Sequence, residues 1–280
     1  MGGDVKRGIR AKHAALSVLK LSAAAADRLR PPPAGVVVLI SHRVGARTPM
    51  EVDLPAALFD SQMAALAASG RAVTIDEALA VVSGPTVPET DPVVVTFDDG
   101  TADFADVALP ILVRHGIPAT LYLATDFVER GREFPHQGQP LSWASVGDAA
   151  STGMVTVGSH THTHALLDRL DPVATADELD RSIGLIEHHL GQPVHHFAYP
   201  KGLEGSPGAA AMVRERFRSA ALAGTRPNPY GRTDPHRLWR SAVQVADGMR
   251  WYSHKLEGGM VFEDIVRQSL NRRRYAGSTT

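Results

Sequence analysis

The sequence predicts an α/β protein with a parallel sheet, built as one domain. Short apolar runs rich in β-branched residues alternate along the chain with segments of helical periodicity. This alternation is typical of parallel strands joined by right-handed helical crossovers. At 280 residues the chain is long enough for a single α/β barrel. Polar residues directly follow several of the apolar runs, which places a catalytic face at the carboxyl ends of the strands.

Each predicted strand is an apolar run bounded by turn-forming residues. The clearest is Val93-Val94-Val95-Thr96-Phe97, which lies between Asp91-Pro92 and Asp98-Asp99-Gly100 and is typical of a buried parallel strand. Strands are expected at 36–40, 93–97, 119–124, 155–158, 194–198 and 241–245.

The predicted helices show apolar stripes and glycine ends. In segment 55–69 the stripe is Leu58, Phe59, Met63 and Leu66, with Gly70 at the C-terminus. Segment 172–190 carries its apolar face on Ile183, Ile186 and Leu190 and ends at Gly191, and segment 101–115 ends at Gly116. Helices are expected at 55–69, 75–82, 101–115, 143–151, 172–190, 209–217 and 262–272.

The N-terminal segment 1–34 predicts a basic amphipathic helix followed by a stiff spacer, Pro31-Pro32-Pro33. Its apolar stretch 14–26 is interrupted by Lys20 and has no clear cleavage site, so it does not match a signal peptide. We expect the helix to pack outside the barrel, with a membrane-surface contact as the alternative. The catalytic domain is expected to span 35–270, and a polar tail 271–280.

Composition excludes several classes of function. The net charge is −1, so no global basic field attracts nucleic acid. The absence of cysteine removes disulfides, thiolate metal sites and cysteine nucleophiles together. The sequence contains no run of about eighteen uninterrupted apolar residues, so it predicts no membrane-spanning helix.

Asp98 and Asp99 stand side by side at the carboxyl end of the strand 93–97. Adjacent side chains on a strand point in different directions around one spot. A buried carboxylate is costly unless it is paired or coordinates a metal. The alternative interpretation is that these residues cap the following helix.

Three histidines at alternate positions form a second polar cluster, His160-Thr161-His162-Thr163-His164. Where a strand turns into a loop, His160 and His164 can converge while His162 points elsewhere. Two imidazoles and one carboxylate are a common metal-binding set that leaves positions open for water and substrate. The alternative is a solvated histidine-rich turn.

Together these segments resemble the NodB-type polysaccharide deacetylases, carbohydrate esterase family 4, over roughly residues 35 to 260. Thr96-Phe97-Asp98-Asp99-Gly100 is similar to the first motif of the family and His160–His164 to the second. Phe197-Ala198-Tyr199-Pro200-Lys201-Gly202 resembles the third, in the variant found in exopolysaccharide deacetylases. Weaker similarities are Ser41-His42-Arg43-Val44, near a Tyr-His-x-Val motif, and Leu141-Ser142-Trp143. The resemblance implies a distorted (β/α) barrel of about seven parallel strands.

The resemblance also implies roles for these residues. Asp99, His160 and His164 would hold a divalent metal, Zn²⁺ first, with Co²⁺ or Ni²⁺ as alternatives, and His162 would lie outside the ligand set. Such a metal activates water and polarises the carbonyl of an amide. Asp98 would be the general base, and the backbone N–H of Lys201 an oxyanion donor. The rest of the third motif, Tyr199, Pro200 and Gly202, would contact the substrate.

Two positions depart from the better-known family pattern. The arginine that orients the catalytic aspartate there is replaced by Ala198, and Arg240 is expected to take the role and to form an ion pair with Asp98. The alternative for Arg240 is a surface arginine lying along Trp239. The motif that supplies the general acid histidine is not recognisable. The candidates are His42, which follows a strand, and His254, which looks helical.

The resemblance therefore implies metal-dependent removal of N-acetyl groups from N-acetylhexosamine units of a polysaccharide or glycolipid precursor. One alternative is a hydrolase of small non-glycan amides. The complete Asp-His-His set argues against it. The other is a catalytically silent carbohydrate-binding protein, which would have no use for Asp98 as a base. We expect a glycan or glycolipid substrate, no nucleic-acid partner, and a location in the cytoplasm or at the inner membrane face.

Overall fold

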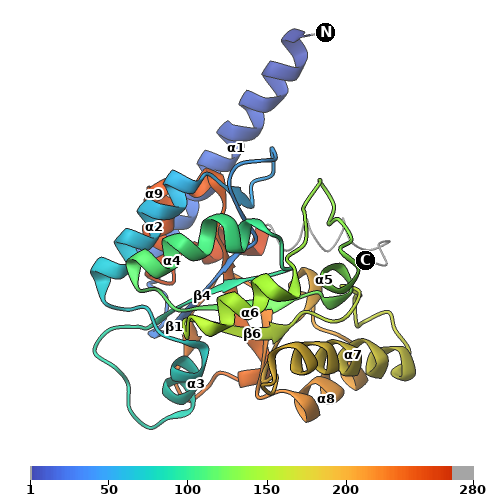
Figure 1. The fold of residues 1–280 in the computed structure, drawn as a ribbon. Helices are drawn as coiled ribbons and strands as arrows, with labels where there is room; N and C mark the ends of the chain where they lie inside the picture. The colour runs from blue at the N-terminus through green and yellow to red at the C-terminus, as the bar shows by residue number, and fades with distance from the viewer. Residues whose placement is uncertain (1, 267–280) are drawn as a thin grey trace.

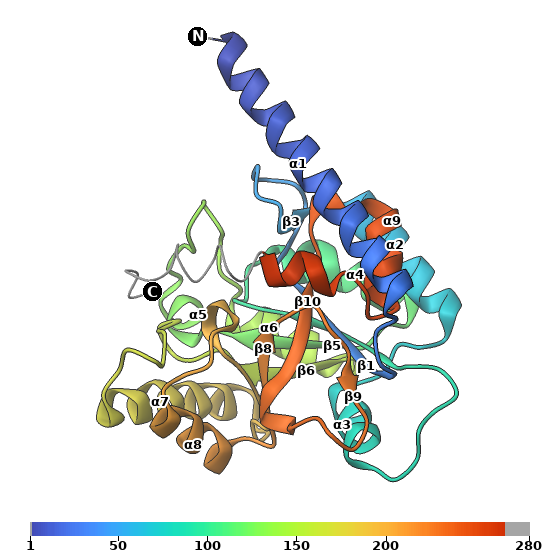
Figure 2. The same cartoon turned by 180° about the vertical axis from the view of Figure 1, so that it is seen from behind.

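The chain forms a closed barrel of seven parallel strands surrounded by helices (Figures 1 and 2). The computed structural model describes residues 2–266. The barrel strands are β1 (Gly35–Ser41), β4 (Val93–Phe97), β5 (Ala119–Leu123), β6 (Val155–Ser159), β7 (His196–Ala198), β8 (Ser219–Ala223) and β10 (Leu238–Ala242). They neighbour one another in this order, and β10 pairs in parallel with β1 to close the ring. The predicted fold class is confirmed.

Three short strands lie outside the ring of seven. β9 (Asn228–Pro229) pairs antiparallel with β1, and β2 (Arg43–Val44) pairs with β3 (Asp53–Leu54) just after β1. The helices are α1 (Gly2–Leu29), α2 (Ala56–Ser69), α3 (Ile75–Ser83), α4 (Leu109–His115), α5 (Thr125–Arg130), α6 (Trp143–Ser151), α7 (Pro172–Leu190), α8 (Pro207–Arg216) and α9 (Gly248–Leu256).

Apolar side chains fill two layers on either side of the strands. The barrel interior is packed by Val36, Val38, Val94, Ala198 and Ala221, together with side chains of α3. The larger layer lies between the strands and the outer helices and includes Val95, Phe97 and Leu121. Because neighbouring residues of a strand face opposite layers, both faces of the central strands are buried. This two-sided burial explains why the strands are continuous apolar runs.

Most predicted elements form within one or two residues of their expected ends, but the predicted helix 101–115 does not. A π-helical turn, Phe104–Ala108, precedes the short helix α4. Pro110, in the first turn of α4, has no N–H to donate, and its ring crowds the carbonyl four residues earlier. The preceding turn widens to avoid this contact.

The predicted strands near the carboxyl end were partly misplaced. The predicted strand 241–245 lies at β10, three residues earlier, so Arg240 is inside the strand instead of before it. The strand expected at 194–198 shortens to β7. β8, α5 and α9 were not predicted. Of the predicted helix 262–272, only residues 262–266 are described, and they are part of a helical segment 261–266. The predicted tail 271–280 lies outside the described residues.

The N-terminal helix α1 packs on the outside of the barrel through its carboxyl half and projects away from it at its amino end (Figure 2). Ala23 and Ala24 contact Trp251 of α9 and Met260. Lys20, buried at 2% exposure, contacts Asp247 at 2.6 Å and Glu263 at 2.8 Å. The membrane contact expected for this helix stays a prediction.

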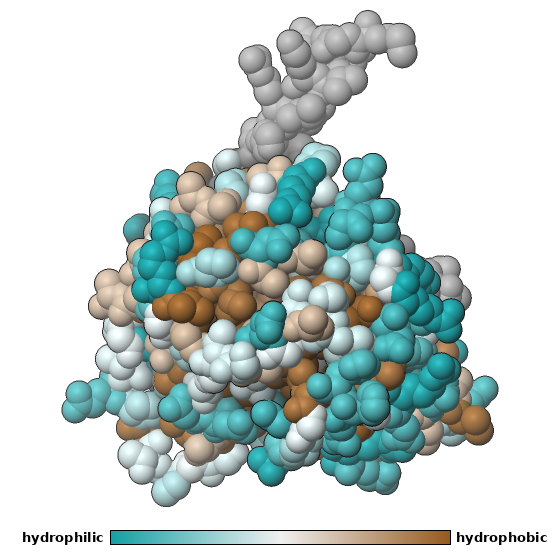
Figure 3. Space-filling model, viewed as in Figure 1, coloured by the Kyte–Doolittle hydropathy of each residue, from teal (hydrophilic) through white to brown (hydrophobic). Residues whose placement is uncertain are grey.

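Hydrophilic side chains cover most of the face shown in Figure 3, and hydrophobic ones appear between them in small patches. Within the described residues, no helix combines the length and apolar character that crossing a membrane requires.

Candidate functional site

The barrel brings the predicted site residues together at the carboxyl edge of the sheet. Asp98 and Asp99 follow β4, His160 follows β6, and the third motif follows β7. Arg240 comes from within β10, and His42 follows β1. Strands that are neighbours in a closed parallel barrel present these ends around one opening.

Asp98 and Arg240 form a buried bidentate ion pair. The Arg240 guanidinium donates one hydrogen bond to each carboxylate oxygen, at 2.6 and 2.8 Å. It also donates to the Thr96 hydroxyl at 3.1 Å and lies over the Tyr122 ring, 5.2 Å from its centre. Arg240 is fully buried. The contact predicted between Arg240 and Asp98 is therefore confirmed, and the interpretation of Arg240 as a surface residue is wrong.

The charge of Arg240 decides the ionisation of Asp98. Burial is the largest single influence and raises the pKa of the Asp98 carboxyl, but the charge and hydrogen bonds of Arg240, with His160 and His42, together lower it by more, so the pKa lies well below the usual range. Asp98 is therefore ionised at neutral pH. Its oxygens bind Arg240 and not the backbone of a following helix, so the helix-capping interpretation of Asp98 is wrong.

Asp99, His160 and His164 converge beside this ion pair. The His164 Nε2 lies 3.5 Å and the His160 Nε2 lies 3.7 Å from one oxygen of Asp99. One ligand atom from each of the three residues lies within 4.8 Å of the others. The His160 Nε2 is also 3.9 Å from an oxygen of Asp98. One carboxylate and two imidazoles at this spacing form a donor set suited to a divalent cation.

The two imidazoles of this cluster have their Nε2 atoms available as donors. His160 Nδ1 lies 2.7 Å from the Ala198 carbonyl oxygen, which can only accept, so Nδ1 carries the proton and Nε2 has a free lone pair. Burial lowers the pKa of His164 to about 3, which keeps its ring neutral at neutral pH. A neutral imidazole is the form that binds a metal. The chemistry of the donor set thus fits a bound cation.

The backbone carries strain at this cluster. Asp99 has φ 76° and His164 has φ 64°, both in the left-handed region that side chains other than glycine rarely adopt. Thr161, between the two histidines, has φ 64°. Residues in such conformations gather at functional sites, where surrounding contacts hold them.

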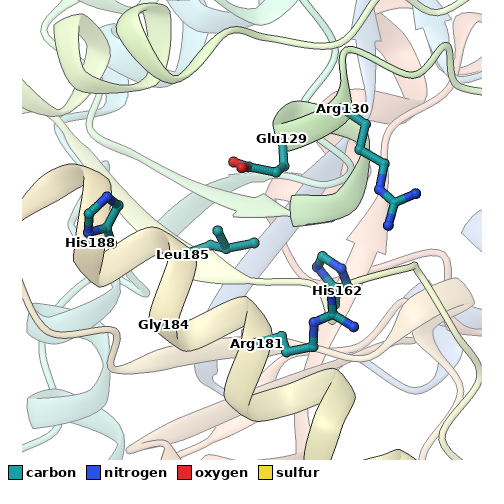
Figure 4. A pocket seen from close by; sticks show the side chains of 7 residues that line it. All are labelled: Glu129, Arg130, His162, Arg181, Gly184, Leu185 and His188. Atoms are coloured by element: carbon teal, nitrogen blue, oxygen red, sulfur yellow. The ribbon is translucent and has the colours of Figure 1, made fainter.

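His162 points away from the other two histidines, as the sequence predicted. Its Nδ1 lies 2.9 Å from the Thr125 hydroxyl and its Nε2 lies 3.6 Å from Asp126. The ring lines a separate cavity of about 440 Å³ between α5 and α7 (Figure 4). The other lining residues are Glu129, Arg130, Arg181, Gly184, Leu185 and His188. Since His160 and His162 are both buried, the interpretation of the segment as a solvated turn is wrong.

The third motif forms a tight turn over the end of β7. Lys201 adopts φ 57° and Gly202 φ 64°. A Cβ atom on Gly202 would lie 2.2 Å from the Ala223 Cβ, so only glycine fits there. Among the described residues, the Lys201 N–H donates no hydrogen bond. It thus has no partner inside the described part of the chain, and its expected role as an oxyanion donor stays a prediction.

Tyr199 lies in the core rather than at a surface. Its side chain is buried and packs edge-on against Phe197, with ring centres 5.0 Å apart. Pro200 is buried beside it. The expected contact of Tyr199 with the substrate needs this correction, because the ring serves packing and only the turn that it anchors faces outward.

Of the two histidines considered as general acid, the fold favours His42. It lies at the catalytic edge, half-buried, and its buried Nδ1 has no hydrogen-bond partner within the described residues. His254 lies on the outer helix α9, where its ring packs against Trp251 with centres 5.5 Å apart.

Several residues of the site were not anticipated from the sequence. Thr96 and Tyr122 surround the Arg240 guanidinium, and Thr125 holds His162. Glu178 of α7 accepts hydrogen bonds from the loop that carries the histidines. A signal for Glu178 existed, because it falls on the buried stripe of its helix with Thr175, Leu179, Ser182 and Ile186.

Comparisons with known proteins find similar sequences and similar folds. The model of the polysaccharide deacetylase family matches residues 86–215. The structure of IcaB from Ammonifex degensii is similar with a TM-score of 0.70 and 26% identity, covering 80% of this chain and 98% of that one. The Streptococcus pyogenes deacetylase PplD, solved in complex with acetate, shares the fold with a TM-score of 0.67 and 20% identity, over 79% of this chain and 98% of that one.

A curated relative is YxkH of Bacillus subtilis, whose name assigns it provisionally to the polysaccharide deacetylases. It is 27% identical over 171 residues, 61% of this chain, and the matched part spans 58% of the length of YxkH.

Fold and site together define a (β/α) barrel that holds an ionised acid beside a candidate metal-binding cluster at the carboxyl ends of its strands. Residues 86–215 thus resemble the polysaccharide deacetylases, and the similar solved structures share the barrel fold.

Proposed function

We propose that the protein is a metal-dependent N-deacetylase of N-acetylhexosamine units in a polysaccharide or glycolipid precursor. The observation that carries the proposal is the position of the Arg240–Asp98 ion pair beside the Asp99, His160 and His164 cluster. A binding module needs neither an ionised buried acid nor the strained backbone around it. A hydrolase needs both a base and an electrophilic centre within reach of one carbonyl carbon.

Asp99, His160 and His164 are the proposed metal ligands, with Zn²⁺ as the first candidate and Co²⁺ or Ni²⁺ as alternatives. When bound, such a cation lowers the pKa of a water and polarises the amide carbonyl. The remaining chemistry belongs to the side chains around it.

Asp98 is the proposed general base. Its position next to the ligand cluster lets it take the proton of the attacking water, and the fork of Arg240 fixes the direction of its oxygens. An acid with a pKa this low is a weak base toward free water. Asp98 can therefore act as a base only on a water whose pKa a neighbouring cation has lowered. For this reason the base and the metal site form one proposal.

The Lys201 N–H and His42 complete the proposed machinery. The strained turn at Lys201 directs its N–H without an internal partner, as an oxyanion donor requires. His42 is proposed to protonate the leaving amine, because its place directly after β1 puts it at the same edge of the barrel as Asp98 and Asp99. Pro200 and Gly202 shape the turn against the substrate.

We also propose that the chain is of the exopolysaccharide type, which carries the Phe-Ala-Tyr-Pro-x-Gly form of the third motif. In this type an arginine on a later strand replaces the one missing at the position of Ala198. The contact between Arg240 and Asp98 supports that assignment.

Acetate release from N-acetylglucosamine oligomers, with metal content measured by elemental analysis, tests the proposal. We expect the Zn²⁺-loaded protein to release acetate, and chelation to abolish the release. Metal-free protein with full activity, or metal-loaded protein that binds the oligomers without releasing acetate, would contradict it.

A further inference from the structure

One side chain of α7 holds the loop that carries the histidine cluster. The Glu178 carboxylate accepts hydrogen bonds from the backbone N–H of His162 at 2.9 Å and of Thr163 at 2.8 Å, both to the same oxygen. Its other oxygen accepts from the Thr163 hydroxyl at 2.6 Å. Glu178 is buried. Three bonds to two consecutive residues fix the middle of the loop between His160 and His164.

The opposite side of the loop is held by α5, through the loop's carbonyl groups. Asp126 N–H donates to the His162 carbonyl at 2.8 Å, and Thr125 N–H donates to the Thr161 carbonyl at 3.3 Å. The loop's carbonyls are thus satisfied by backbone donors, whereas the N–H groups of residues 162 and 163 depend on Glu178. Without this acceptor both N–H groups would be unsatisfied, which the folded loop tolerates poorly.

Strained residues flank the segment that Glu178 binds, so the loss of the Glu178 hydrogen bonds would change the conformation of the loop. Thr161 and His164 lie in the left-handed region on either side of the residues that Glu178 binds. Such conformations persist only when surrounding contacts impose them. Release of the segment 162–163 would let His164 relax and move its Nε2 away from Asp99.

We propose that Glu178 is a positioning residue that sets the geometry, and hence the metal affinity, of the Asp99, His160 and His164 cluster. This inference rests on the proposed metal site. Glu178 contacts none of the three proposed ligands in the hydrogen bonds described, so it acts through the loop backbone. Residues one step removed from a metal typically change its affinity by about 10- to 100-fold when they are replaced.

Variants of Glu178 can distinguish an effect on the geometry of the metal cluster from an effect on the stability of the whole domain. Glu178→Ala removes the acceptor. Glu178→Gln keeps it, because the amide oxygen can accept from both N–H groups while the amide nitrogen donates to the Thr163 hydroxyl. Asp171→Ala is the matched control, because Asp171 caps the N-terminus of the same helix by accepting from Ala174 N–H and does not touch the loop.

The test measures Zn²⁺ affinity by competition with a chromophoric chelator, the visible spectrum of the Co²⁺-substituted protein, and the urea midpoint of the metal-free protein. We expect Glu178→Ala to weaken Zn²⁺ binding by about 10- to 100-fold and to alter the Co²⁺ spectrum. Glu178→Gln should restore wild-type affinity and spectrum. Asp171→Ala should lower the urea midpoint and leave Zn²⁺ affinity unchanged.

Wild-type affinity and spectrum in Glu178→Ala would overturn the inference, as would a Glu178→Gln protein that binds Zn²⁺ as weakly as Glu178→Ala. If Glu178→Ala does not fold, Glu178→Asp replaces it. That variant keeps the charge and withdraws the carboxylate by one methylene, and unchanged affinity in it would overturn the inference. A wild-type protein that binds no Zn²⁺ would overturn the proposed metal site as well, so the two failures are distinguishable.

Discussion

Arg240 binds both oxygens of Asp98 inside the barrel, at 2.6 and 2.8 Å. The pair links β10 to the end of β4, two strands that are separated in the barrel by β1. The planar fork of the guanidinium fixes the plane of the carboxylate as well as its charge. This relationship gives the proposed base a single orientation toward Asp99, His160 and His164.

Arg240→Lys should therefore lower kcat/KM for acetate release by roughly tenfold or more although it conserves the charge. A lysine ammonium is a point charge and cannot hold both oxygens of Asp98 in one plane. Zn²⁺ content should stay at the wild-type level. Activity of the variant within about twofold of wild type would show that charge alone is enough.

Asp98→Asn should keep the metal and lose at least about 10²-fold in kcat, the usual range for a missing general base. The amide is nearly isosteric with the carboxylate but cannot accept a proton from water. Asp99→Asn is the control, and it should lose metal. If the losses of metal were reversed between the two variants, the roles of Asp98 and Asp99 would be exchanged.

His164→Ala should remove bound Zn²⁺, whereas His162→Ala should retain most of it. The ring of His164 lies 3.5 Å from Asp99, whereas that of His162 contacts Thr125 and faces another cavity. Elemental analysis of both purified variants measures the difference. Equal metal loss in the two proteins is the result that counts against the assignment.

The metal-free protein should lose stability as the pH falls below about 6.5. Burial lowers the pKa of His164 from 6.5 to about 3, so between these values the unfolded chain binds a proton that the folded chain does not. Stability therefore falls with falling pH across this window, by at most about 1.4 kcal/mol per pH unit for this group.

Urea midpoints of chelator-treated protein between pH 7 and about 4.5 measure this dependence. His164→Asn should show a shallower dependence than wild type, because it lacks the group that the fold keeps neutral. Parallel curves for the two proteins would mean that His164 is readily protonated in the folded state.

Lys20→Met should destabilise the protein by about 3–5 kcal/mol, the usual cost of breaking a buried ion pair from one side. The change leaves Glu263 without the ammonium that lies 2.8 Å from it. Val18→Ser, at an exposed position of the same helix, is the control and should have little effect. An unchanged urea midpoint for Lys20→Met would show that α1 is not energetically part of the domain.

The central part of the fold could be predicted from the sequence because its strands are buried on both faces. β4 and β5 are continuous apolar runs, and such runs are hard to mistake. β8, with the sequence Ser219-Ala220-Ala221-Leu222-Ala223, contains no β-branched residue and gives no local strand signal. It becomes a strand because β7 and β10 pair with it on either side.

Site residues, like strands, could be predicted only where a local sequence pattern marks them. Adjacent acids and alternating histidines are local patterns, so Asp98, Asp99, His160 and His164 were visible in the sequence. The placement of β10 was wrong because a charged residue in a strand looks like its boundary. Arg240 is tolerated there only because Asp98 neutralises it inside the barrel. Glu178 could be noticed only as an acid on the buried stripe of its helix, because its partners are mainly backbone N–H groups, which leave no pattern in the sequence.

The strand that carries Arg240 is also the strand that closes the ring, with Leu39 opposite Ser241 and Ile40 opposite Ala242. During synthesis the chain emerges from its N-terminus, so Asp98 leaves the ribosome 142 residues ahead of its partner. A nascent chain that stops before β10 has an open ring and an acid without its counter-charge. The formation of β10 therefore both closes the barrel and supplies the counter-charge that fixes Asp98, the proposed base.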